Sequence, residues 1–358
     1  MTGLPTPDLT PSPRQRLAAM LSVEGTAPFP LDRATLSRLV TRIDAVPLFI
    51  HAYTFHFHLL DEVWGPGDLL DFAAAHGLAG VQCHVFDAGR RSLAAMAPAD
   101  RRALGARARD LGLRWHVEVS STTPEDLGAA LAVAADLGAE SIRCYPRYAG
   151  RVSGILERVA ADLLWVLDRL GPKGRFRLVV EQHEDLTSEE MVRIVKTCAD
   201  PRVGLLFDTG NMVNAGERPM EALRIQAPWV RAVHLKDVLM LPDRGGWAQF
   251  GCRTGTGDVP LARMLADLLV LGEETPQVTA IGLEEEVNYV APAYRFPGEP
   301  PDPVIPPREP SLTARLPGLS DAMSRQIEHR DALAQLQWVR TMFAEMRALA
   351  SAIIEGQE

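Results

Sequence analysis

Eight short apolar runs alternate with longer amphipathic stretches along this chain of 358 residues, and this alternation constrains the fold more than any other feature. The runs are rich in β-branched residues, whereas apolar residues in the intervening stretches recur at helical spacing. Near-continuous apolar strands separated by helices predict a parallel sheet that is buried on both faces. The predicted strands cover residues 48–53, 80–85, 113–119, 141–145, 177–181, 203–208, 231–235 and 280–285.

Several of the amphipathic stretches carry residues that start and stop helices. Thr123 precedes a proline that suits the first helical position, Thr187 and Glu190 form a capping box, and glycines such as Gly138 stand where helices end. Eight strand–helix units over about 250 residues fit a closed (β/α)₈ TIM barrel, an α/β fold, better than an open doubly wound sheet. The open sheet remains the alternative, since the number of strands does not prove closure.

Three segments lie outside the repeating units. We expect residues 1–46 to form a mobile N-terminal tail and a helix near 31–45, and residues 47–358 to form a single TIM-barrel domain. Residues 291–312 are so rich in proline that they predict an insertion after the eighth strand, and residues 321–356 predict a C-terminal helix.

Composition excludes several classes of protein. With 37 Lys and Arg against 46 Asp and Glu, the formal net charge is −9, which opposes a broad nucleic-acid or anionic-membrane surface. Four scattered cysteines form no CxxC motif and favour free thiols over a disulfide scaffold. The N-terminus has no apolar core typical of a signal peptide, and no apolar run approaches the length of a membrane span. We therefore expect a soluble, cytoplasmic protein.

Four residues of metal-ligand type stand at the ends of the last four predicted strands: Glu181, Asp208, His234 and Glu284. The carboxyl ends of barrel strands meet at one face, so these side chains are expected to converge. Three carboxylates buried together need a cation, and an oxygen-rich set with one imidazole suits Mn²⁺, Mg²⁺ or Co²⁺. A lone Asp after a strand is more often a helix cap or an ion-pair partner, but recurrence on successive strands favours a metal site.

The phrases VVEQHEDLTSEE, GLLFDTGNM, AVHLKDV, GTGDVP and IGLEEE resemble the xylose isomerase-like TIM-barrel family of sugar phosphate isomerases and epimerases, which includes ketose 3-epimerases and inosose isomerases and dehydratases. The resemblance covers residues 47–290 and is densest over 177–286. It implies one divalent ion held by Glu181, Asp208, His234 and Glu284, with Mn²⁺ preferred and Mg²⁺, Co²⁺ or Zn²⁺ as alternatives. Glu286 shares a strand face with Glu284 and stays open as the last ligand.

The resemblance also implies roles in catalysis. Glu181 and Glu284 would remove and return a proton on opposite faces of a small keto-sugar or related polyol, next to a metal-polarised carbonyl. His183 matches a substrate-binding histidine of the family, and Arg253 matches a basic residue that contacts substrate oxygen atoms. Asn211 stands where some ketose epimerases place a substrate-binding histidine.

The first half of the predicted barrel carries polar residues for which the family offers no template. We favour substrate binding for His84 and a structural role for His116. Arg143 either binds an acidic group of the substrate or pairs with an acid such as Glu181. Lys236 is expected to form an ion pair with its neighbour Asp237. Function and structure are equally favoured for the three histidines after the first strand, His51, His56 and His58.

Three alternatives to an isomerase or epimerase remain. A lyase of the same family, of the inosose or 3-keto-glycoside type, would form the same enolate but expel a β-substituent. A nuclease resembling endonuclease IV would need more ligands and a DNA-binding surface that the net charge of −9 opposes. A non-catalytic scaffold is disfavoured because all four ligand types are present. The expected partner is a small sugar-like molecule, not nucleic acid or membrane, with a homo-oligomer or an accessory subunit left open.

Overall fold

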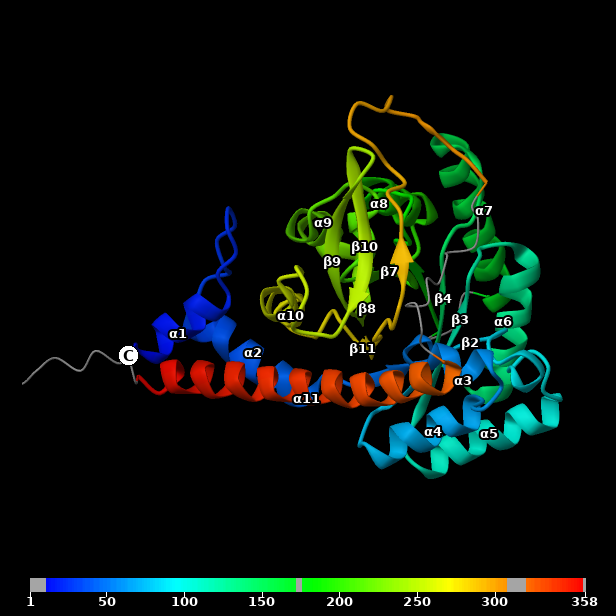
Figure 1. Cartoon of the computed structure of the whole chain (residues 1–358), viewed down its shortest axis with the longest axis horizontal. Helices are drawn as coiled ribbons and strands as arrows, with labels where there is room; N and C mark the ends of the chain where they lie inside the picture. The colour runs from blue at the N-terminus through cyan, green and yellow to red at the C-terminus, as the bar shows by residue number, and fades with distance from the viewer. Residues whose placement is uncertain (1–10, 172–175, 308–319, 357–358) are drawn as a thin grey trace, which may run out of the picture.

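The computed structural model describes residues 11–171, 176–307 and 320–356, and its centre is a closed barrel of eight parallel strands (Figure 1). The predicted TIM barrel is therefore confirmed, and the open sheet is wrong. Each predicted apolar run forms one strand, and the strands follow chain order around the barrel until the last pairs with the first. They are β1 (Leu48–His51), β2 (Gly80–His84), β3 (Arg114–Val119), β4 (Ser141–Cys144), β6 (Arg177–Glu181), β7 (Val203–Asp208), β8 (Val230–Leu235) and β11 (Ala280–Leu283).

Helices surround the barrel, and their ends follow the expected capping. The Thr123 side chain accepts a hydrogen bond from the Asp126 backbone, Thr187 and Glu190 form a reciprocal capping box, and Gly138 ends a helix at φ 70°. The outer helices are α4 (Pro66–Ala75), α5 (Pro98–Asp110), α6 (Pro124–Leu137), α7 (Val152–Leu170), α8 (Ser188–Cys198), α9 (Pro219–Gln226), α10 (Leu261–Leu269) and α11 (Asp321–Ile354).

The barrel interior has an apolar layer beneath a polar one. Phe49, Val179, Leu206, Ala232 and Ala280 form a separate buried cluster inside the barrel. Because side chains alternate across a strand, the inward residue two positions further along each of these strands lies one layer closer to the carboxyl end. Those residues are His51, Glu181, Asp208, His234 and Gly282. The period of the strands thus stacks ionisable groups directly above an apolar floor.

The N-terminal region contains a helix that the sequence analysis missed. Residues 1–10 of the predicted tail lie outside the described residues, but α1 (Pro13–Met20) follows at once and contacts α11. Its first turn is closed by a capping box between Ser12 and Gln15, a signal present in the sequence. The predicted helix near 31–45 is confirmed as α2 (Arg33–Ala45), which lies beside α11 (Figure 1).

A small antiparallel sheet is built from two strands that lie between His234 and Glu284 and one that follows Glu284. It consists of β9 (Asp237–Asp243), β10 (Gly246–Cys252) and β12 (Val290–Ala291), none of which the sequence analysis predicted. The proline-rich segment leaves this sheet and reaches the start of α7, where β13 (Val304–Ile305) pairs with β5 (Gly150–Arg151) (Figure 1). Asp302 accepts hydrogen bonds from the Ser153 backbone and hydroxyl, which fastens this connection. Residues 308–312 of the predicted insertion lie outside the described residues.

The long helix α11 is bound to the loop after β1 through a buried carboxylate. Glu328 accepts hydrogen bonds from the backbone N–H groups of Phe57 and His58, at 2.6 and 3.2 Å, and lies 2.7 Å from His58 Nδ1. His58 therefore has a structural role. None of the described helices is both long enough and apolar enough to cross a membrane. The four cysteines are free thiols, as expected.

Replacing Glu328 with alanine should lower the free energy of unfolding by about 2–4 kcal/mol, because two buried N–H groups and an imidazole lose their acceptor. Chemical denaturation followed by circular dichroism measures the loss. Glu345→Ala on the same helix is the matched control: this side chain is 44% exposed, so its change should stay below about 1 kcal/mol. Equal losses in the two variants would contradict the structural role of Glu328.

Candidate active site

A cavity of about 160 Å³ opens at the carboxyl ends of the barrel strands. Its lining contains most of the residues predicted to act at the site, contributed by both halves of the barrel. Of the predicted site residues, Glu181, Glu284, His183, Asn211, His84 and Arg143 line it. Asp208 and His234 are buried against these residues, at 2% and 0% exposure. The convergence expected of the strand ends is therefore observed.

The four predicted metal ligands and His51 form two overlapping groups that share His234. Donor atoms of Glu181, Asp208 and His234 lie within 4.8 Å of one another, and so do those of His51, His234 and Glu284. His234 Nδ1 is 3.7 Å from a Glu181 oxygen and 3.4 Å from a Glu284 oxygen. This nitrogen and one oxygen of each of the three carboxylates are buried without a hydrogen bond, although Glu181 Oε2 forms an ion pair with Arg143 and Asp208 Oδ2 lies 3.3 Å from Lys236 Nζ. Buried ligand atoms without hydrogen bonds fit a divalent ion.

Backbone and amide hydrogen bonds orient these ligands. One oxygen of Asp208 accepts hydrogen bonds from the backbone N–H groups of Gly210 and Asn211, at 2.7 and 2.9 Å, which leaves the other oxygen facing the group. The Asn211 side-chain amide donates to Glu181 Oε1 at 3.0 Å. Asn211 thus positions two ligands as well as lining the cavity.

The charges of the group are poorly balanced by the side chains alone. Burial, and then the neighbouring carboxylates, raise the pKa of Asp208 to about 7 in spite of Lys236. Burial also acts to raise the pKa of Glu181, but the Arg143 guanidinium and His234 outweigh it and lower that pKa. Burial acts to lower the pKa of His234, whereas the facing carboxylates raise it to about 10. The site therefore favours additional positive charge at its centre.

Lys236 pairs with acids of the site rather than with its neighbour in sequence. Its ammonium lies 2.9 Å from Glu286 Oε1 and 3.3 Å from Asp208 Oδ2. The expected pair with Asp237 is wrong, because adjacent residues in extended chain point in opposite directions. Asp237 instead accepts hydrogen bonds from the backbone N–H groups of residues 255 and 257. With Glu286 bound to Lys236, the arrangement favours Glu284 as the last ligand.

The sequence analysis missed Glu118 on β3, which joins the two halves of the site. Its carboxylate lies 2.7 Å from His51 Nε2, 3.2 Å from His234 Nε2 and 3.6 Å from the Arg143 guanidinium. A carboxylate that accepts the second N–H of a metal-binding histidine fixes the orientation of its ring. The alternation of His116 and Glu118 along β3 was the available signal for an inward-facing acid.

Three of the remaining predicted substrate-binding residues line the cavity, and the fourth lies away from it. His183 stacks on Tyr145 with ring centroids 4.0 Å apart, and His84 lies 2.9 Å from the Ser120 hydroxyl. Arg143 forms an ion pair with Glu181, the second of the roles considered for it. Arg253 does not line the cavity: its guanidinium pairs with Asp331 of α11 at 2.9 Å and its side chain is 44% exposed.

Several further residues line the cavity that the sequence analysis did not select for the site. They include three tyrosines, an arginine and two histidines, which lie at the ends of the strands or in the segments that follow them. These are Tyr53, Tyr145, Tyr289, Arg147, His51 and His56. His116, by contrast, packs on Phe49, and burial lowers its pKa to about 4, in agreement with the structural role expected for it.

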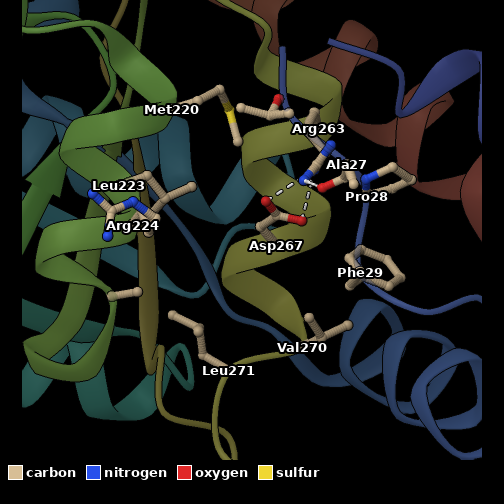
Figure 2. A pocket seen from close by; sticks show the side chains of 12 residues that line it. Ala27, Pro28, Phe29, Met220, Leu223, Arg224, Arg263, Asp267, Val270 and Leu271 are labelled. Carbon is tan, nitrogen blue, oxygen red and sulfur yellow. Dashed lines mark hydrogen bonds and ion pairs between the residues drawn. The ribbon is translucent and has the colours of Figure 1, made fainter. Parts of the chain in front are cut away.

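A larger cavity, of about 490 Å³, lies away from these residues (Figure 2). It is bounded by α9, by α10 and by residues 26–29, and most of the side chains that line it are apolar. The acid among them, Asp267, is paired with Arg263 at 2.8 Å. The groups suited to catalysis therefore converge in the smaller cavity at the strand ends.

Comparison with known proteins identifies a family and a relative of similar length. A family model described as a xylose isomerase-like TIM barrel matches residues 70–275. YihM, an uncharacterised protein of Escherichia coli K12, is 41% identical over 319 residues, which are 88% of this chain and 97% of YihM.

Two solved structures share the fold. A D-psicose 3-epimerase crystallised in the presence of D-fructose aligns with a TM-score of 0.55 and 14% identity, over 82% of this chain and 99% of that one. An IOLI protein with a zinc atom aligns with a TM-score of 0.53 and 15% identity, over 67% of this chain and 89% of that one. At such identities the likeness is one of fold alone.

Replacing Glu118 with glutamine should weaken divalent-metal binding by about 10- to 100-fold, because the His234 ring loses its charged acceptor. Calorimetric titration with Mn²⁺ measures the change. Glu140→Gln, at a side chain that is 56% exposed, is the control and should bind Mn²⁺ as the wild type does. Wild-type affinity in the Glu118 variant would show that His234 needs no orienting carboxylate.

Proposed function

The chain belongs to the xylose isomerase-like TIM-barrel family, and on this basis we propose that it is a divalent-metal-dependent isomerase or epimerase of a small keto-sugar or related polyol. The observation that carries the proposal is the convergence of Glu181, Asp208 and Glu284 on His234, with a buried atom of each left without a hydrogen bond. The sugar and the zinc atom named for two barrels of the same fold are consistent with it. Location in the cytoplasm stays a prediction.

Glu181 and Glu284 are placed to handle the proton on two sides of a substrate. They follow β6 and β11, which are separated in the barrel by β7 and β8, and they flank His234. A divalent ion held by the four ligands would polarise the substrate carbonyl and its neighbouring hydroxyl. Glu181, held ionised by Arg143, would remove the proton next to the carbonyl and keep it, and Glu284, protonated beforehand through His51 Nδ1 at 3.2 Å, would return its own proton from the other side and end ionised.

The size of the cavity favours a small substrate. At about 160 Å³ it is well below the range of about 300–1,000 Å³ typical of pockets for drug-sized ligands. A cavity of this size does not favour a bulky glycoside. A lyase acting on a small keto-sugar would begin with the same removal of a proton. It would then expel a β-substituent, whereas an isomerase or epimerase returns a proton to the substrate.

Elemental analysis of protein purified without added metal should find about one divalent ion per chain, and Asp208→Ala should lose it because a buried charged ligand is removed. Incubation with Mn²⁺ and with Zn²⁺ before the analysis compares the two metals. Asp100→Ala, on the outer helix α5, is the control and should keep the metal. Absence of metal from the wild type even after incubation would favour a scaffold, and two or three zinc ions would favour a nuclease.

Glu181→Gln should abolish turnover while the fold is retained, since both the base and a ligand charge are lost. Keto-sugars incubated with the wild type in D₂O should gain deuterium next to the carbonyl, and the variant should be slower by at least about 10³-fold. Formation of an unsaturated product without return of the proton would identify a lyase. Deuterium uptake by the variant at the wild-type rate would refute the assignment of Glu181.

A further inference from the structure

Three side-chain cations line the cavity, and one of them forms no ion pair with the residues that the structure describes. Arg143 is paired with Glu118 and Glu181, and Lys236 is paired with Asp208 and Glu286. Arg147, the third, forms no ion pair within the described part of the chain. One of its terminal nitrogens donates to the Tyr145 hydroxyl at 2.9 Å, and its Nε is buried without a hydrogen-bond partner.

An aromatic ring, rather than a carboxylate, supports the Arg147 guanidinium. Its Cζ lies over the Tyr145 ring at 5.1 Å, and the same ring stacks on His183 and faces Arg143. The nearby acid Glu184 is engaged elsewhere, since it accepts the Tyr289 hydroxyl and lies 3.6 Å from His183 Nδ1. The N–H groups of Arg147 that do not reach Tyr145 are thus left for a ligand in the cavity.

A buried guanidinium N–H without an acceptor is costly, and oxyanions are the acceptors that arginine binds best. Arg147 lines the same small cavity as Glu181 and Glu284. One small molecule bound there can therefore contact the guanidinium and the two carboxylates. We propose that Arg147 binds an oxyanion group of the substrate, a carboxylate or a phosphate monoester, and that the enzyme acts on an acidic keto-sugar rather than a neutral one. This inference rests on the proposed function for the site of proton transfer.

Three matched ketoses test the inference: D-fructose, its 6-carboxylate D-fructuronate, and D-fructose 6-phosphate. Calorimetric titration of the metal-loaded protein should show tighter binding of one or both acidic sugars than of D-fructose, and the tighter acid identifies the oxyanion. Arg147→Gln should weaken binding of the acidic sugar by about 10- to 100-fold and change D-fructose binding by less than about threefold. Arg147→Lys, which keeps the charge, should retain part of the difference.

Arg151→Gln is the control, since this side chain lies four positions further along the chain and is 70% exposed. It should leave binding of all three sugars unchanged. Preferential binding of D-fructose by the wild type would overturn the inference. So would an Arg147→Gln variant that weakens all three sugars equally, because a merely structural role predicts that result.

Deuterium exchange on the same sugars separates the two proposals. Exchange without any advantage of the acidic sugars would overturn the role of Arg147 and leave the isomerase proposal standing. Arg147-dependent binding of an acidic sugar without exchange or product would support the oxyanion site and count against the proposed reaction.

Discussion

The burial of several carboxylates at the strand ends determines which other charged groups this barrel must contain. Five carboxylates, Glu118, Glu181, Asp208, Glu284 and Glu286, lie at 6% exposure or less around the strand ends. Arg143 and Lys236 are the permanent cations paired with them, so the acids outnumber their partners. Carboxylates held this closely out of water are stable only if further positive charge is supplied. Protonated His234 supplies one such charge, since the facing carboxylates raise its pKa to about 10.

The alternation of side chains along each strand places these carboxylates inside the barrel. Because side chains alternate, a residue two positions beyond an apolar floor residue points into the same barrel. Glu181 stands above Val179, Asp208 above Leu206, and the same offset recurs on the other strands. Gly282 completes the layer: a Cβ there would collide with the Gln82 side-chain oxygen, so the absence of a side chain leaves room beside His234.

The strands and the polar residues at their ends could be predicted from the sequence, because both depend on local patterns of apolar and polar residues. The eight strands and the four ligand positions each depend on a run of apolar residues and on the polar residue that ends it. Glu118 was missed because it lies within its strand, where only closure of the barrel shows that it faces His234. The family resemblance assigned Arg253 to the substrate, but the fold sets Asp331 of α11 beside it, and α11 lies outside the part of the chain that resembles the family.

The pairing of β5 with β13 has a consequence for how related barrels differ in the molecules they bind. The loop that carries Tyr145 and Arg147 is held at one end by β4 and at the other by β5, whose partner strand belongs to the proline-rich segment. That segment contributes none of the four ligands, so changes in its length or sequence would move Arg147 while leaving Glu181, Asp208, His234 and Glu284 in place. Related chains with a different proline-rich segment are therefore expected to share one chemistry and to differ in which molecules they admit to it.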